Sequence, residues 1–266
     1  MEDKTILGSL DPELMERATS RRDALRGLGR MGMTAAVASV PVALATMAKS
    51  AFAQSSALPA DIVSVLNFAL ALEYLESEFY NTGVGTSGLI PASDRPIFTQ
   101  IQKHENAHVA LLKGALGSSA IAKPTFDFTA GGNFTPFTSY AQFQALSQAF
   151  EDTGVRAYKG QAGNLMGNKD ILTIALQIHS VEARHASEVR RLRGQKGWIT
   201  GNSRGDLPAA TQPVYDGDDV TTQLGVDVAS VSGRSTNSVT EAFDEPLTRA
   251  QVAAIANLFI VSPKLS

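Results

Sequence analysis

A carboxylate and an imidazole recur three residues apart at two places in this chain of 266 residues. Glu105 and His108 form the first pair, and Glu182 and His185 form the second. Residues three apart on a helix share a face, so each pair can direct two donor atoms to one point. One such pair alone is typical of a solvated helix surface. Two copies indicate a metal site.

A further glutamate precedes each pair at a similar distance. Glu73 lies 32 residues before the first pair and Glu151 lies 31 residues before the second. A tyrosine follows each of these glutamates after seven residues, Tyr80 and Tyr158, so the chain has two similar halves. Glu76 borders the same helix face as Glu73 and is the alternative ligand. The repeated spacing to a tyrosine favours Glu73.

These residue types suit two divalent cations. Four carboxylates offset the charge of the ions, and two neutral imidazoles complete the coordination shells without adding charge. The glutamate and histidine pairs lie on the apolar stripes of their segments, where burying a carboxylate costs several kcal/mol unless it is paired or bound to metal. We therefore predict two iron or manganese ions, with six ligands: Glu73, Glu105, His108, Glu151, Glu182 and His185.

Tyr80 and Tyr158 are the candidate catalytic residues. Each lies on the same helix face as a predicted ligand, two turns further along, where it could donate a proton or an electron. The alternative is a pair of hydrogen-bonded core tyrosines. His104 and His179, the remaining histidines, are close to the motifs in sequence, and we expect contacts around the ligands from them rather than ligation.

The apolar periodicity predicts an all-α protein built as a four-helix bundle. The first helix should begin after Pro59, with Asp61 as its N-cap, and end at Asn81. A stretch from 118 to 139 is rich in Gly, Thr, Pro, Ser and Phe and has no helical period, so it should cross over between the second and third helices. The other three helices are predicted at about 94–117, 140–166 and 169–193.

Four short motifs carry a resemblance to a known family. They are Leu-Asn-Phe-Ala-Leu-Ala-Leu-Glu-Tyr-Leu-Glu at 66–76, Ala-Phe-Glu-Asp at 149–152, Val-Glu-Ala-Arg-His-Ala at 181–186 and Phe-Asp-Glu-Pro-Leu-Thr at 243–248. With them the chain resembles the ferritin-like-domain proteins related to the plant desiccation-related proteins, over nearly all of residues 58–262. The resemblance implies a ferritin-like four-helix bundle with a dinuclear metal site. It implies little about the substrate.

The chain should divide into three parts. Residues 54–195 form the predicted bundle, and residues 196–266 form a polar extension. The extension should end in a helix from Leu247 to Val261 that Thr248 caps and that packs on the bundle. An acidic run at 216–219 predicts a turn, because it lacks the spaced ligands of a calcium loop. Arg190 and the other arginines near the end of the fourth helix should face solvent and the negative end of the helix dipole.

Residues 1–53 have the pattern of a twin-arginine export signal. Arg21 and Arg22 precede an apolar stretch at 31–48, and Ala51-Phe52-Ala53 has the form of a cleavage site. A membrane anchor is the alternative, but Pro41 and the cleavage motif favour removal of the segment. We expect export to the bacterial periplasm or exterior, with no stable membrane insertion after cleavage.

Composition excludes several kinds of function. The chain has no cysteine, which rules out disulfides, thiolate metal sites and thiol catalysis. A net charge of −3 without a basic patch argues against nucleic-acid partners.

Three functions fit the sequence. The leading hypothesis is a metal centre acting on dioxygen or peroxide. The second is a non-catalytic protein that binds metal or protects against desiccation and stress, and the third is a bundle that binds a partner through its crossover or extension. The number of subunits stays open, a homo-oligomer included.

Overall fold

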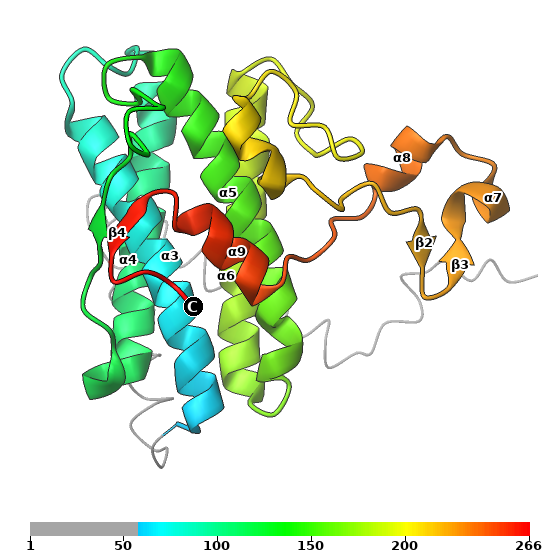
Figure 1. The fold of residues 1–266 in the computed structure, drawn as a ribbon, viewed down its shortest axis with the longest axis horizontal. Helices are drawn as coiled ribbons and strands as arrows, with labels where there is room; N and C mark the ends of the chain where they lie inside the picture. The colour runs from blue at the N-terminus through cyan, green and yellow to red at the C-terminus, as the bar shows by residue number, and fades with distance from the viewer. Residues whose placement is uncertain (1–57) are drawn as a thin grey trace, which may run out of the picture. The chain divides into compact units, whose positions relative to one another are not determined.

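A computed structural model describes residues 58–266 of the chain, so the predicted signal at 1–53 lies outside the described residues. Four long helices lie side by side in it (Figure 1). The fold class predicted from the apolar periodicity, an all-α four-helix bundle, is confirmed. The helices are α3 (Ala60–Gly85), α4 (Arg95–Leu116), α5 (Tyr140–Ala162) and α6 (Lys169–Leu192).

The helix ends follow local capping chemistry. Ser139 and Asn168 cap α5 and α6, each accepting a hydrogen bond from the backbone N–H three residues on. The expected cap of α3 is wrong, since Pro59 holds the cap position and Asp61 lies inside the first turn. An acidic residue there still favours the helix, because the N-terminal end of the helix dipole is positive. α3 also runs past Asn81 to Gly85.

Two apolar clusters fill the bundle. One contains Ile62 and Leu70 from the first half of α3, and the other contains Phe79 and Tyr80 from its second half. α3 is buried almost all round, which makes it a central helix. The carboxylate of Glu73 lies between its two apolar halves and is fully buried.

The crossover and the C-terminal end of the chain meet. β1 (Thr125–Phe126) pairs antiparallel with β4 (Ile260–Ser262), and Phe128 and Phe134 of the crossover are buried in the apolar core. The final helix, α9 (Arg249–Ala256), is shorter than the predicted 247–261, because β4 forms from its last residues. Thr248 caps α9 in a capping box with Gln251, which confirms the expected cap.

The extension is less uniform than a polar tail. Between the bundle and α9 it forms short elements only. Two parts of the extension, η4 and α9, contact α5. Across residues 58–266 no helix combines the length and the apolar character needed to cross a membrane. Two short elements lie between bundle helices, η2 (Gly117–Ser119) and η3 (Gly163–Leu165). The short elements of the extension are η4 (Ala209–Val214), β2 (Thr222–Gln223), β3 (Val226–Asp227), α7 (Val228–Ser232) and α8 (Thr236–Thr240).

Candidate metal centre

The fold brings all six predicted ligands together inside the bundle. The four glutamates are fully buried, and the two histidines are nearly so. Their side chains form two groups of donor atoms, and in each group the atoms lie within 4.8 Å of one another. The first group is Glu73, Glu105, His108 and Glu182, and the second is Glu105, Glu151, Glu182 and His185.

Glu105 and Glu182 belong to both groups. Nδ1 of His108 lies 3.0 Å from Oε2 of Glu105 and 3.0 Å from Oε1 of Glu182. Nδ1 of His185 lies 2.9 Å from the other oxygen of Glu105, Oε1, and 3.7 Å from the other oxygen of Glu182, Oε2. Each shared carboxylate thus offers one oxygen to each group.

The donor atoms are arranged as a cation would require. Besides the two shared carboxylates, Oε2 of Glu73 lies 3.2 Å from Nδ1 of His108, but a single N–H can satisfy only one of the three oxygens well. Within the described part of the chain, Oε1 of Glu105 and both carboxylate oxygens of Glu182 are buried without a hydrogen-bond partner. Buried polar atoms are almost always partnered. A divalent cation in each group would satisfy them, so the residues present fit a dinuclear metal centre.

Burial and charge shift the pKa values of several side chains of the centre. Burial raises the pKa of Glu73 to about 8 and that of Glu151 well above its usual value. Burial by itself lowers the pKa of His108, but the charge of Glu73 and hydrogen bonds to the carboxylates outweigh it and raise that pKa. Protons therefore occupy the site when no cation is bound, and metal binding has to displace them.

Two tyrosines hold the glutamates that belong to one group each. The hydroxyl of Tyr158 on α5 donates a hydrogen bond of 2.5 Å to Oε1 of Glu73 on α3. The hydroxyl of Tyr80 on α3 donates to Oε1 of Glu151 on α5. The sequence spacing associated each tyrosine with the glutamate of its own helix. The structure instead pairs each tyrosine with the glutamate of the other half.

The two remaining histidines lie around the ligands. Nδ1 of His104 is 2.8 Å from Nε2 of His185, the ring nitrogen that faces away from the donor group. Such an outer contact fixes the ring orientation of a ligating histidine. Nδ1 of His179 lies 3.0 Å from the backbone oxygen of Val155. Neither histidine belongs to a donor group formed by residues 58–266.

Glu76 is buried beside the centre but is absent from both donor groups of the described chain, which favours Glu73 as the α3 ligand. A Cβ on Gly154 would lie 3.3 Å from Oε1 of Glu76 and 3.5 Å from Cγ of Glu182. The missing side chain at Gly154 leaves room for both. The sequence already indicates this complementary pair. Gly154 follows Glu151 by three residues in the second half, and Glu76 follows Glu73 by three residues in the first half.

A buried ion pair that the sequence did not predict lies next to the centre. Arg190 does not face solvent as expected but is buried, with Nη2 2.5 Å from Oδ2 of Asp152. The hydroxyl of Tyr215, from the extension, donates a hydrogen bond of 2.7 Å to the same Asp152 oxygen. Because Asp152 follows Glu151 directly, these contacts fix α5 against α6 and the extension at the level of a predicted ligand.

Comparison with known proteins agrees with this architecture. The sequence model of a family described as "Ferritin-like domain" matches residues 61–195, which run from α3 through the end of α6. No curated protein matches the chain.

Proposed function

The chain belongs to the ferritin-like domain family, and from this premise we propose that it holds two iron or manganese ions and reacts with dioxygen or peroxide. The observation that carries the proposal is the pair of donor groups that share Glu105 and Glu182. Shared carboxylates keep two ions close together, which suits the two-electron chemistry of an O–O bond. Glu73 and His108 would complete one coordination shell, and Glu151 and His185 would complete the other.

The bound ions would supply one electron each, so that dioxygen with two protons could become hydrogen peroxide, or peroxide with two protons could become water. The chain's own residues hold the charge and the protons. Tyr80 and Tyr158 stay protonated and donate hydrogen bonds to Glu151 and Glu73, respectively, since burial raises the pKa of both phenols well above the usual value. The apolar clusters on either side of the site limit the access of water.

Metal content per chain tests this function most directly. Protein purified without chelators should contain iron or manganese at one ion per donor group, as measured by plasma mass spectrometry. Iron-loaded protein prepared without air should then consume dioxygen or peroxide, over many turnovers when an external reductant such as ascorbate returns the two electrons to the ions. Metal without turnover would leave the non-catalytic, protective function, and no metal would overturn the proposal. Export of the protein and a role in desiccation stay predictions from the sequence.

Replacing Tyr80 or Tyr158 by phenylalanine separates two roles for these residues. Because each hydroxyl holds a ligand carboxylate, we expect metal affinity to fall by about 10–100-fold and stability to fall by about 1–3 kcal/mol. At saturating metal we expect turnover close to that of the unaltered protein. Isothermal calorimetry, thermal unfolding and steady-state kinetics measure the three quantities. Turnover that is lost at full metal occupancy would instead show that the phenol donates a proton or an electron.

A further inference from the structure

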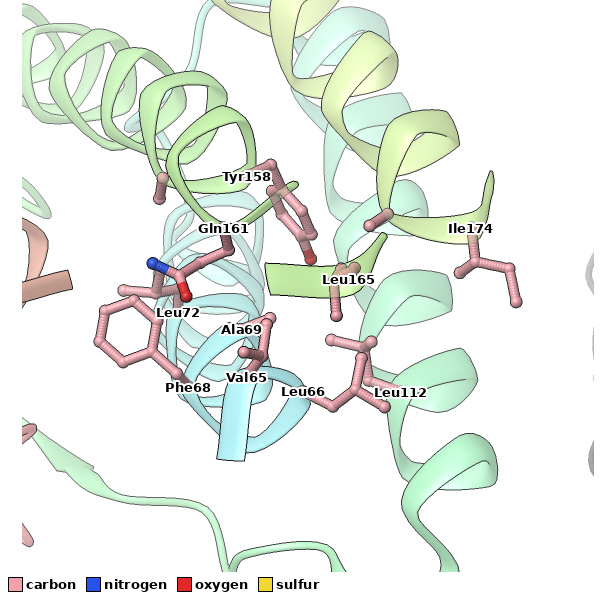
Figure 2. A pocket seen from close by; sticks show the side chains of 12 residues that line it. Val65, Leu66, Phe68, Ala69, Leu72, Leu112, Tyr158, Gln161, Leu165 and Ile174 are labelled. Atoms are coloured by element: carbon pink, nitrogen blue, oxygen red, sulfur yellow. The ribbon is translucent and has the colours of Figure 1, made fainter. Parts of the chain in front are cut away.

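An apolar cavity of about 20 Å³ lies within the bundle, against Tyr158 (Figure 2). Figure 2 shows side chains of α3, among them Leu66 and Ala69, facing Tyr158 and Gln161 of α5 across it. Leu112 of α4 and residues of η3 and α6 complete the wall. Ten of the twelve lining residues are apolar, and the two polar ones are Tyr158 and Gln161.

The cavity is one side chain away from the candidate metal centre. Tyr158 lines it and also donates its hydroxyl hydrogen to Glu73, a member of the first donor group. A molecule held in the cavity would therefore contact Tyr158, which is hydrogen-bonded to the predicted ligand Glu73. Ala69, which also lines the cavity, lies one helical turn before Glu73 on α3.

The hydroxyl hydrogen of Tyr158 and the amide oxygen of Gln161 are engaged elsewhere. The phenolic hydrogen of Tyr158 goes to Glu73, and Oε1 of Gln161 accepts a hydrogen bond from Asn164. A buried water needs two to four polar partners, and apolar cavities stay dry and take up apolar guests. Hydrogen peroxide needs hydrogen bonds as water does, whereas dioxygen needs none. With room for little more than one water-sized molecule, the cavity suits a diatomic gas.

A surface pocket adjoins this cavity. Val65 and Gln161 line both the cavity and a surface pocket of about 480 Å³, so these two side chains form the partition between them. A second approach to the centre is different in character. A surface groove of about 420 Å³ is lined by His104, His185, Arg184 and other residues of α4 and α6. His104, Arg184 and Glu188 offer that groove hydrogen-bonding groups for a polar molecule such as peroxide, whereas the cavity offers few.

We propose that the apolar cavity beside Tyr158 is a binding and entry site for dioxygen. The proposal rests on the proposed function, which it narrows from dioxygen or peroxide to dioxygen as the molecule that enters on the Tyr158 side. Dioxygen passes between Val65 and Gln161, occupies the cavity and reaches the metal centre past the Tyr158 hydroxyl.

Filling the cavity tests the assignment. Ala69→Val adds two methyl groups to its wall from α3, and Ala175→Val does so from α6 if the first variant folds poorly. The matched control is Ala256→Val on α9. Ala256 lines a different cavity that also measures about 20 Å³ and shares only Leu72 with the proposed entry site. Overpacking should therefore destabilise control and test variants to a similar extent.

Occupancy is measured first, by methyl NMR of zinc-loaded protein under dioxygen pressure, or of metal-free protein if zinc does not bind. Paramagnetic dioxygen should speed the relaxation of the Leu66 and Leu112 methyl groups. This enhancement should be lost in Ala69→Val and kept in Ala256→Val. No enhancement in the unaltered protein would overturn the assignment.

Kinetics of the iron-loaded protein provide the second measurement. We expect Ala69→Val to lower kcat/KM for dioxygen roughly tenfold and to leave the rate with peroxide unchanged. An equal fall with peroxide, or an equal fall in Ala256→Val, would overturn the entry path. If the protein takes up no metal, the proposed function fails, and the relaxation measurement still decides whether the cavity binds dioxygen.

Discussion

Glu182→Gln is expected to abolish binding of both metal ions, whereas Glu151→Gln is expected to leave one of them bound. Glu182 contributes to both donor groups, and Glu151 contributes only to the second. The substitution keeps the volume of the side chain and removes its negative charge. Both oxygens of Glu182 lie near a histidine nitrogen but lack a well-formed hydrogen bond among residues 58–266, so the charge offered to a cation is the main interaction that the substitution removes.

The expected loss of affinity is large. Removing an outer hydrogen bond of a metal ligand costs about 10–100-fold in affinity, and removing a ligand shared by two ions should exceed that range. The stabilisation by added metal should also be smaller in Glu182→Gln than in Glu151→Gln, because a bound ion stabilises only the folded chain. Metal added to Glu182→Gln should leave its Tm unchanged, while metal added to Glu151→Gln should raise the Tm by part of the original increment. Metal analysis and thermal unfolding with and without metal measure both effects.

Glu188→Gln is the matched control. Glu188 lies on α6, as Glu182 does, but it lines the surface groove and belongs to neither donor group of the described chain. The Glu188→Gln variant should keep the metal content of the unaltered protein. Two ions retained in Glu182→Gln would show that the two groups do not share this carboxylate, and the dinuclear arrangement proposed above would then be wrong.

Local geometry explains which parts of the site the sequence could predict. A spacing of three residues on a helix places Glu105 beside His108 whatever the rest of the fold does. The position of these pairs on apolar stripes then implies that they face the interior. Which side chain of another helix meets them is a matter of packing. The bond from Tyr158 to Glu73 joins residues 85 positions apart, and a repeated sequence spacing could not reveal that exchange between halves.

The extension was the least predictable part for the same reason. β1 pairs with β4 across 137 positions, with Thr125 opposite Ser262, and each strand is too short to leave a periodic signal. Arg156 also gave no signal, since a charged residue in a helix usually faces water. It is instead one of the largest fully buried side chains, 1% exposed, and its partners are carbonyl groups of the extension.

Arg156→Met is expected to release the extension from the bundle and to destabilise the protein by about 3–5 kcal/mol, which is the usual effect of breaking a buried charge pair. The guanidinium donates hydrogen bonds to the carbonyl oxygens of Glu245, Val214 and Asp216, at 2.6, 2.5 and 3.1 Å. Nε also lies 3.7 Å from Oδ1 of the buried Asp218. Methionine keeps much of the side-chain volume and removes every donor, so three carbonyl groups lose a hydrogen bond and the Asp218 carboxylate loses its ion pair.

The extension should become the first part of the chain to open. Gly160 shows how tightly it is held, since a Cβ there would lie 2.0 Å from the carbonyl oxygen of Leu247. Limited proteolysis should therefore cut Arg156→Met between residues 200 and 247 under conditions that leave the unaltered protein intact. Denaturant unfolding gives the change in free energy. The bundle helices and their donor groups should stay folded in the proteolysed product, so its metal content tests whether the site needs the extension.

A second substitution distinguishes lost charge compensation from lost packing. Burial raises the pKa of Asp218 to about 6, and Arg156 opposes this shift. Without the arginine the buried carboxylate loses its ion-pair partner, so Arg156→Met with Asp218→Asn should be more stable than Arg156→Met alone. Lys196→Met is the control, because its ion pair with Glu241 involves a lysine side chain that is 60% exposed and should contribute at most about 1 kcal/mol. Equal losses in Arg156→Met and Lys196→Met would contradict a buried anchor, because burial is what makes the first interaction strong.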